Sequence, residues 1–141
     1  MSDAFSLSLH SSLYLQTLQS MKRLMLLLSA VITLSVYGQT YQELSEYGIE
    51  LMEKDSLAKA EGVFRQAMKL EPANPYNALL FSNVGIIQRS MGKYNEAEES
   101  FTLALNITPF SIPVLLNRAT VNMQLGNTNR AYVDYCQVLD L

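Results

Sequence analysis

Few side chains in this chain of 141 residues could carry acid–base, metal-ion or nucleophilic chemistry. The single histidine, His10, stands near the start of the chain, so the rest offers no histidine to bind a metal or act as a general base. Glu96, Glu98 and Glu99 form an acidic cluster, which we expect on the solvent face of a helix. These residues give no candidate catalytic centre.

Two further features could carry chemistry, a glycine–lysine pair and a single cysteine. Gly92-Lys93 lacks the earlier glycine and the following Ser or Thr that a phosphate-binding loop needs. Cys136 has no second cysteine to pair with, so we expect a half-buried helix residue, with an intermolecular disulfide as the alternative. We therefore predict no enzyme activity, no cofactor and no metal site.

The composition suits one small globular domain. Apolar residues make up 49% of the chain and charged residues 16%, and the net charge is −3. Residues 41–141 hold 12 acidic and 8 basic side chains, without a basic run. Because binding to phosphates needs clustered lysine or arginine, this distribution argues against a nucleic-acid partner.

Small residues, aromatic residues and prolines recur at fixed spacings along residues 41–141. The pattern that begins at Gly48 begins again at Gly85 and at Ala119, a period of about 35 residues, which marks helical repeats. Its members are Gly48, Ala60, Phe64, Ala67, Pro72, Gly85, Ala97, Phe101, Ala104, Pro109, Ala119, Ala131 and Tyr135.

Each repeat unit reads as a helix, a turn and a second helix. Leu44, Tyr47 and Leu51 follow a helical period, and Thr40 with Glu43 reads as a capping box. The first helices are expected to end at Asp55, Gly92 and Gly126, the second helices to be capped by Asn95 and Thr128, and the prolines Pro72 and Pro109 to close them.

The small residues are expected where paired helices touch. Two helices approach to about 8–10 Å when contact positions carry little side chain. We therefore expect Gly48 to face Ala60 and Gly85 to face Ala97. The aromatic residues Phe64, Phe101 and Tyr135 are then expected to fill the space toward neighbouring helices.

Residues 41–141 resemble three tetratricopeptide repeats, about residues 41–74, 78–111 and 112–141, the last one incomplete. Gln88 departs from the family pattern, as do Arg118, Asn122 and Val138 in the third unit. The resemblance implies an all-α fold, an α-solenoid of stacked antiparallel helix pairs that winds into a right-handed superhelix. This domain is expected to span residues 39–141.

The resemblance also implies a concave groove, lined by the first helix of each pair, that binds another protein or a peptide segment. Lysines are missing from this face, and only Asn83, Asn117 and Arg89 resemble a clamp for a terminal carboxylate, so we expect an apolar segment instead. The alternative is that these residues pack against one another. The implied groove residues are Gln42, Ser45, Ile49, Met52, Glu53, Leu79, Ser82, Ile86, Arg89, Ser90, Leu116, Thr120, Met123 and Gln124.

The start of the chain resembles a secretory signal. Two bases and an apolar run over residues 24–36 follow Met21, so residues 21–38 are predicted to be a signal peptide that is cleaved between Gly38 and Gln39. Residues 1–20 are then an extension ahead of the true start at Met21, a genuine long leader being the alternative. We expect an exported protein, periplasmic or secreted; the other possibility is an uncleaved segment that anchors it in a membrane.

The last predicted helix leaves Tyr135, Val138, Leu139 and Leu141 without a neighbour. We expect either that the chain is the front of a longer protein or that this end docks onto another copy or a partner. The predicted function is a protein-interaction module or scaffold of an exported protein. The alternative is the N-terminal input or binding module of a longer regulatory or envelope-assembly protein.

Overall fold

The computed structural model describes residues 13–28 and 40–141. Residues 13–28 form a helix, which includes the first part of the predicted signal peptide. Residues 29–38 and the predicted cleavage site lie outside the described residues, as do residues 1–12 of the predicted extension. Among the described helices, none is both long and apolar enough to cross a membrane.

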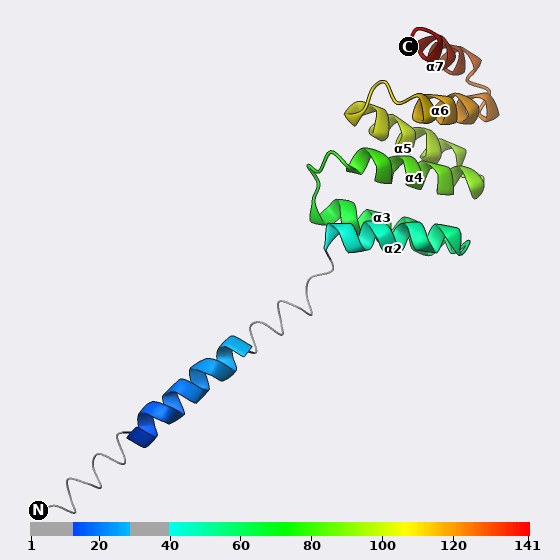
Figure 1. Ribbon diagram of the computed structural model, residues 1–141. Helices are drawn as coiled ribbons and strands as arrows, with labels where there is room; N and C mark the ends of the chain where they lie inside the picture. The colour runs from blue at the N-terminus through cyan, green and yellow to red at the C-terminus, as the bar shows by residue number, and fades with distance from the viewer. Residues whose placement is uncertain (1–12, 29–39) are drawn as a thin grey trace, which may run out of the picture. The chain divides into compact units, whose positions relative to one another are not determined.

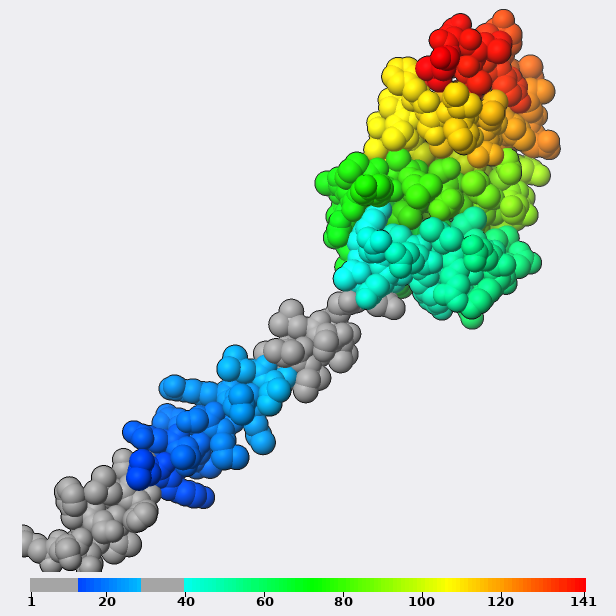
Figure 2. All heavy atoms as spheres, viewed as in Figure 1, coloured from blue at the N-terminus to red at the C-terminus, as the bar shows by residue number. Residues whose placement is uncertain are grey.

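Residues 40–141 form one compact unit built from helices alone. The helices are α2 (Tyr41–Glu53), α3 (Leu57–Leu70), α4 (Asn77–Ser90), α5 (Tyr94–Ile107), α6 (Ile112–Gln124) and α7 (Thr128–Leu139). Consecutive helices pair as antiparallel hairpins, and the pairs stack on one another through α3 with α4 and α5 with α6 (Figures 1 and 2). This arrangement confirms the predicted all-α solenoid.

The turn within each pair places one residue in the left-handed region. Asp55, Gly92 and Gly126 have φ angles of 55°, 74° and 76°, at the positions predicted from the sequence. The residue after the left-handed one closes the preceding helix: the backbone N–H of Lys93 donates to the carbonyl of Gln88 at 2.8 Å. Equivalent bonds close α2 and α6, so the three hairpins share one turn geometry.

The prediction that Asn95 and Thr128 cap the second helices is wrong. Helix α5 follows Lys93 and helix α7 follows Asn127, and neither N-cap side chain bonds the helix. The turn is so short that Lys93 both ends α4 and begins α5. Its N–H closes α4, and its carbonyl accepts from the N–H of Ala97, in the first turn of α5, at 3.0 Å. Such a turn does not require a side-chain cap.

The capping box at the start of α2 is confirmed. The backbone N–H of Glu43 donates to the hydroxyl of Thr40 at 3.2 Å, and the N–H of Thr40 donates to the Glu43 carboxylate at 2.9 Å. The second helices end ahead of the two repeat-frame prolines: α3 ends at Leu70 before Pro72, and α5 ends at Ile107 before Pro109.

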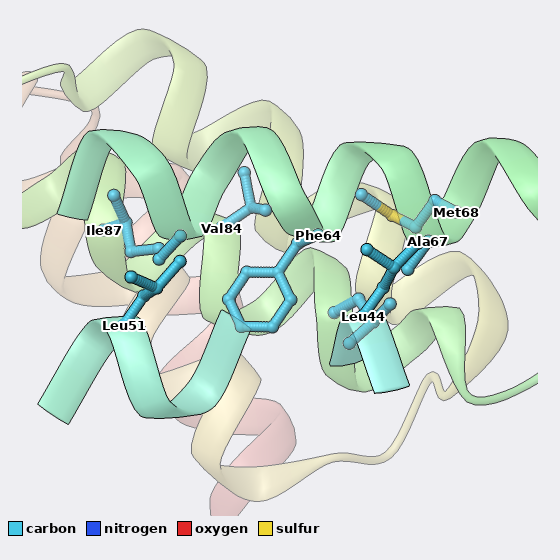
Figure 3. Packing of buried hydrophobic residues seen from close by; sticks show 9 residues of the cluster. Leu44, Leu51, Phe64, Ala67, Met68, Val84 and Ile87 are labelled. Atoms are coloured by element: carbon cyan, nitrogen blue, oxygen red, sulfur yellow. The ribbon is translucent and has the colours of Figure 1, made fainter. Parts of the chain in front are cut away.

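A phenyl ring fills the space beside each repeat glycine. Phe64 and Phe101 are completely buried, and Figure 3 shows the Phe64 ring among the apolar side chains of the first core. A Cβ atom added to Gly48 would lie 2.4 Å from a ring carbon of Phe64, and one added to Gly85 would lie 2.7 Å from Phe101. The ring thus packs on the glycine of its own helix pair. Phe64 also belongs to one core cluster with Val84 and Ile87 of α4, which agrees with the predicted filling of space toward neighbouring helices.

The third pair departs from this pattern. Ala119 carries a methyl group where the other two pairs have a glycine, and the side chain of Tyr135 is 38% exposed. The prediction that Tyr135 fills the helix interface is therefore wrong. Tyr47 is also exposed, at 45%, although it shares the helical period of the buried Leu44.

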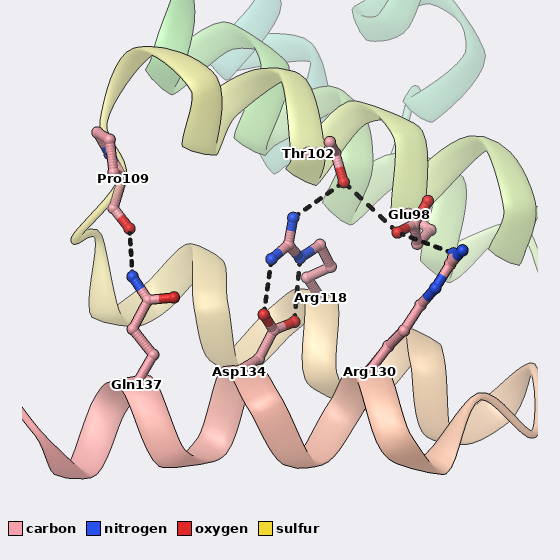
Figure 4. A network of polar contacts seen from close by, with 7 residues as sticks. All are labelled: Glu98, Thr102, Pro109, Arg118, Arg130, Asp134 and Gln137. Atoms are coloured by element: carbon pink, nitrogen blue, oxygen red, sulfur yellow. Dashed lines mark hydrogen bonds and ion pairs between the residues drawn. The ribbon is translucent and has the colours of Figure 1, made fainter.

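An ion pair ties the third helix pair together where other positions of the core are apolar. Arg118 on α6 donates two hydrogen bonds to Asp134 on α7, at 2.6 and 3.0 Å, and a third to the hydroxyl of Thr102 on α5, at 3.1 Å (Figure 4). These bonds to Asp134 raise the pKa of the Arg118 guanidinium above its ordinary value. Asp134 is 2% exposed, so loss of its partner would cost several kcal/mol, about 3–5 for a buried pair.

Gln88, which departs from the family pattern at a position that is usually tyrosine, also makes polar contacts in the interior. The buried Gln88 accepts from the hydroxyl of Ser100 at 2.7 Å and donates to Glu61 at 3.0 Å, which joins α4 to both neighbouring helices. Asn122 stands at the same position of the third pair. Its oxygen accepts from Asn127 at 3.2 Å, whereas its buried nitrogen has no partner among the described residues.

The packing of phenyl rings on glycines predicts opposite effects for two glycine-to-alanine changes. Gly48→Ala forces a methyl group against the buried Phe64, and overpacking of this kind costs about 1–3 kcal/mol, more than the gain in helix propensity. Gly62→Ala is the matched control, since no atom lies within 4 Å of its added Cβ, and it should stabilise the helix by about 0.5–1 kcal/mol. Thermal melts followed by circular dichroism measure both; equal effects would contradict the packing.

Candidate binding face

The first helices of the three pairs, α2, α4 and α6, are joined directly to one another. Tyr41 on α2 donates its hydroxyl hydrogen to the side-chain oxygen of Asn77 on α4 at 3.0 Å. Arg89 on α4 donates to the side-chain oxygen of Asn117 on α6 at 2.7 Å. These bonds hold the three helices as one row, which we call the first-helix face.

Two hollows open along this face, on either side of the start of α4. The α2–α4 hollow has a volume of about 550 Å³, and the α4–α6 hollow about 880 Å³. Both are lined in part by Tyr76 and Leu79, so these two side chains form the wall between them. Their volumes lie within the range of about 300–1,000 Å³ that is usual for binding pockets.

Buried polar bonds fix the wall between the hollows. Asn77, which is 2% exposed, accepts from Tyr41 and donates to the carbonyl oxygens of Glu71 at 2.8 Å and Pro72 at 3.2 Å. One amide therefore ties the connection between α3 and α4 to helix α2. Burial raises the pKa of the Tyr41 hydroxyl above its ordinary value. A hydrogen bond with Ser45 lowers this pKa by less, and the charge of Glu71 makes the smallest contribution, which raises it.

The α2–α4 hollow is acidic. Its lining includes the carboxylates of Glu46 and Glu71, together with the apolar Ile49. Glu46 accepts from the amide of Gln42 at 2.9 Å, and Glu71 accepts from the amide of Asn74 at 2.7 Å. Neither carboxylate forms an ion pair with a described residue, so both charges are directed to solvent or to a ligand.

The α4–α6 hollow is apolar and carries no charged side chain. Prolines and aromatic residues of the two connections, 71–76 and 108–111, meet there with the first turns of α4 and α6. Tyr76 is 72% exposed and Phe110 is 68% exposed, which is unusual for side chains of this size. Both connections lie at the same edge of the helix stack (Figure 1).

The predicted groove residues fall into three groups. One group lines the hollows: Gln42, Ser45 and Ile49 line the α2–α4 hollow, Ser82 lines the α4–α6 hollow, and Leu79 lines both. Of these, Ser82 is only 8% exposed. Met52 and Ile86 are half-buried and pack against the two hydrophobic cores. Of the remaining predicted residues, Glu53, Thr120 and Met123 are exposed and line neither hollow, and Arg89 is half-buried.

Arg89 and Asn117, which resemble parts of a carboxylate clamp in the sequence, form a hydrogen bond with each other. The 2.7 Å bond between them occupies the oxygen of Asn117 and one N–H of the guanidinium. No lysine, arginine or histidine lines either hollow in the described part of the chain. The positive charge that a clamp for an anionic chain end needs is therefore absent from both hollows.

The sequence analysis missed Tyr76 and Phe110, the two exposed aromatic residues of the hollows. It assigned the groove to the first helices and treated the connections as loops. A signal was present: each connection carries a proline followed directly by an aromatic residue, as Pro75-Tyr76 and Pro109-Phe110. Because the aromatic residues stand outside the repeat pattern, helical periodicity could not place them.

Comparison with known proteins finds similarity to tetratricopeptide repeat proteins. Residues 80–111, which include most of α4 and all of α5, match the model of the tetratricopeptide repeat. The crystal structure of a tetratricopeptide repeat protein from Parabacteroides merdae has a TM-score of 0.70 with this chain and is 43% identical. The match covers 72% of this chain and 40% of that chain. Residues 80–111 are thus a tetratricopeptide repeat by sequence, and the helical body has the fold of tetratricopeptide repeat proteins.

Other tetratricopeptide repeat proteins are similar over much the same region. The second repeat domain of Spaghetti (RPAP3), solved bound to the HSP90 peptide SRMEEVD, has a TM-score of 0.66 and 25% identity, over 73% of this chain and 93% of that chain. The human mitochondrial import receptor subunit TOM34 is 28% identical over 74% of this chain and 36% of its own length. The chain spans about a third or less of such curated relatives.

The tetratricopeptide repeat family consists in general of modules that bind other proteins. Over residues 13–28 and 40–141, no three His, Cys, Asp or Glu side chains come together as metal ligands would. The polar side chains that line the two hollows are carboxylates, amides and hydroxyls. This arrangement can bind a chain through hydrogen bonds, charge and apolar contact.

Proposed function

We propose that this protein binds an extended segment of another protein on the first-helix face, as a scaffold or adaptor without catalytic activity of its own. The observation that carries the proposal is the pair of hollows on one face, with large apolar side chains left exposed in them. Ile49 is 40% exposed and Leu79 is 55% exposed. Apolar side chains on an open face favour association with a partner that covers them.

The relatives support binding of a segment rather than of a whole folded surface. The related domain of Spaghetti (RPAP3) was solved with a seven-residue peptide of HSP90, SRMEEVD. The hollows here are open and adjacent, which suits side chains that follow one another along an extended chain. The identity of the partner does not follow from the fold.

We also propose that the protein is exported from the cytoplasm. The support is the order of two bases, an apolar run and small residues that begins at Met21. Cleavage between Gly38 and Gln39 would leave Thr40, the N-cap of α2, one residue from the new N-terminus. The mature protein would then begin directly ahead of the helical body.

A double substitution on the first-helix face tests the binding function. Ile49→Asp with Leu79→Asp places two charges in the hollows, and burying them beneath a ligand without partners is unfavourable, so affinity should fall at least tenfold. The ligands are peptides selected on the wild-type protein from a displayed library of random linear peptides. Fluorescence anisotropy measures their affinity, and circular dichroism checks that both proteins are equally helical.

The matched control for this test changes two exposed apolar residues away from the hollows. Leu103→Asp on α5 with Val133→Asp on α7 adds the same charge to the protein, at side chains 38% and 61% exposed. These changes should leave peptide affinity within about twofold. Peptides that bind the two double variants equally well would show that the first-helix face is not the binding site.

Export makes a separate prediction. When the full reading frame is expressed in a bacterial host, the protein recovered outside the cytoplasm should begin at Gln39. N-terminal sequencing reads this directly. A recovered chain that keeps residues 24–36 would contradict cleavage, and a protein found entirely in the cytoplasm would contradict export.

A further inference from the structure

We propose that the segment bound on the first-helix face carries a basic side chain two positions from a bulky apolar one, with the base in the α2–α4 hollow and the apolar side chain in the α4–α6 hollow. This inference rests on the proposed function and specifies the chemistry of its partner. It is carried by the difference between the two hollows, which share a wall but have opposite character.

The α4–α6 hollow sets the apolar part of the ligand. It is lined by side chains that offer large apolar surfaces, above all Tyr76, Leu79 and Phe110, and by the prolines of both connections. Phe110 and Tyr76 stand on separate connections, so a side chain that enters between them is contacted from two sides. Its volume of about 880 Å³ admits a leucine, methionine or aromatic side chain. The burial of such a side chain contributes about 1.5–3 kcal/mol.

The α2–α4 hollow sets the charge of the ligand. Glu46 on α2 and Glu71 on the connection both line it, and each carboxylate accepts a hydrogen bond from a neutral amide but forms no ion pair within the described part of the chain. Glu71 acts electrostatically on Tyr41, which lines the same hollow. A lysine or arginine of the ligand would form ion pairs with these carboxylates. An apolar side chain in this hollow would instead desolvate the carboxylates without giving them a partner, which is unfavourable.

The shared wall sets the order of the two side chains. Because Tyr76 and Leu79 line both hollows, neighbouring side chains of one extended segment can occupy them together. Successive side chains of an extended chain point to opposite sides, so a base and an apolar residue two positions apart point the same way. An acidic segment, by contrast, would meet two carboxylates in one hollow and no charged group in the other.

The test uses the peptides selected from the random library and reads their sequences as well as their affinities. Lysine or arginine should be enriched close to a large apolar residue. Peptides in which glutamate replaces the lysine or arginine of the selected sequences, synthesised as probes, should bind at least tenfold more weakly than the selected peptides. Addition of salt should weaken the selected peptides, because their charges are partly exposed in the complex.

Neutral variants assign the charge preference to the α2–α4 hollow. Glu46→Gln with Glu71→Gln keeps the shape of the side chains and should weaken the basic peptides about three- to tenfold at low salt, as expected for two partly exposed ion pairs. Glu96→Gln with Glu99→Gln removes the same charge from exposed positions on α5 and should leave affinity within about twofold. Phe110→Asp should weaken the same peptides at least tenfold.

The outcomes separate this inference from the function on which it rests. Selected peptides that need Ile49 and Leu79 but show no enrichment in bases, or that bind the two neutral variants equally, would overturn the inference and leave segment binding in place. Tight binding of the glutamate-substituted peptides would overturn it in the same way. A library that yields no peptide dependent on the first-helix face would contradict both.

Discussion

The contact between a glycine on a first helix and a phenyl ring on the second brings the two helices of a pair together. At Gly48 and Gly85 the missing side chain leaves room for Phe64 and Phe101, and both rings are completely buried. Burial of a ring of this size is one of the larger apolar contributions available to so small a unit. The helix axes can approach because one contact surface is bare backbone, and the short left-handed turn then closes each hairpin.

The close pairs determine where the binding face can form. Once each pair is closed, the second helix of one pair packs on the first helix of the next, and the first helices line up as a row. Polar side chains then fix the register of the row: Asn77 ties α4 to α2, and Arg89 with Asn117 ties α4 to α6. The connections 71–76 and 108–111 are left at one edge, where they close two hollows of different charge. Structure and binding chemistry thus follow from one repeated contact.

The fold could be predicted because its signals are local and repeat. Gly48 and Gly85 and their partners recur in register, and Asp55, Gly92 and Gly126 mark the turns. The predicted caps at Asn95 and Thr128 were wrong because one residue can end one helix with its N–H and begin the next with its carbonyl. Rules based on side-chain propensity do not describe such a turn. The burial of Tyr135 was predicted wrongly because the spacing pattern treats alanine and glycine alike, although the methyl group of Ala119 occupies the space that a glycine leaves free. Tyr76 and Phe110 were missed because they come to line the same hollow only in three dimensions, and helical periodicity carries no information on the connections.

A double-mutant cycle between Gly48 and Phe64 measures the central contact most directly. If the ring occupies the space of the missing side chain, Gly48→Ala should cost much less in a Phe64→Leu background than in the wild type, because the smaller side chain leaves room for the methyl group. The expected coupling, taken from urea unfolding of the four proteins, is about 0.5–3 kcal/mol. Equal costs of Gly48→Ala in both backgrounds would contradict the account, since the two residues would then act independently.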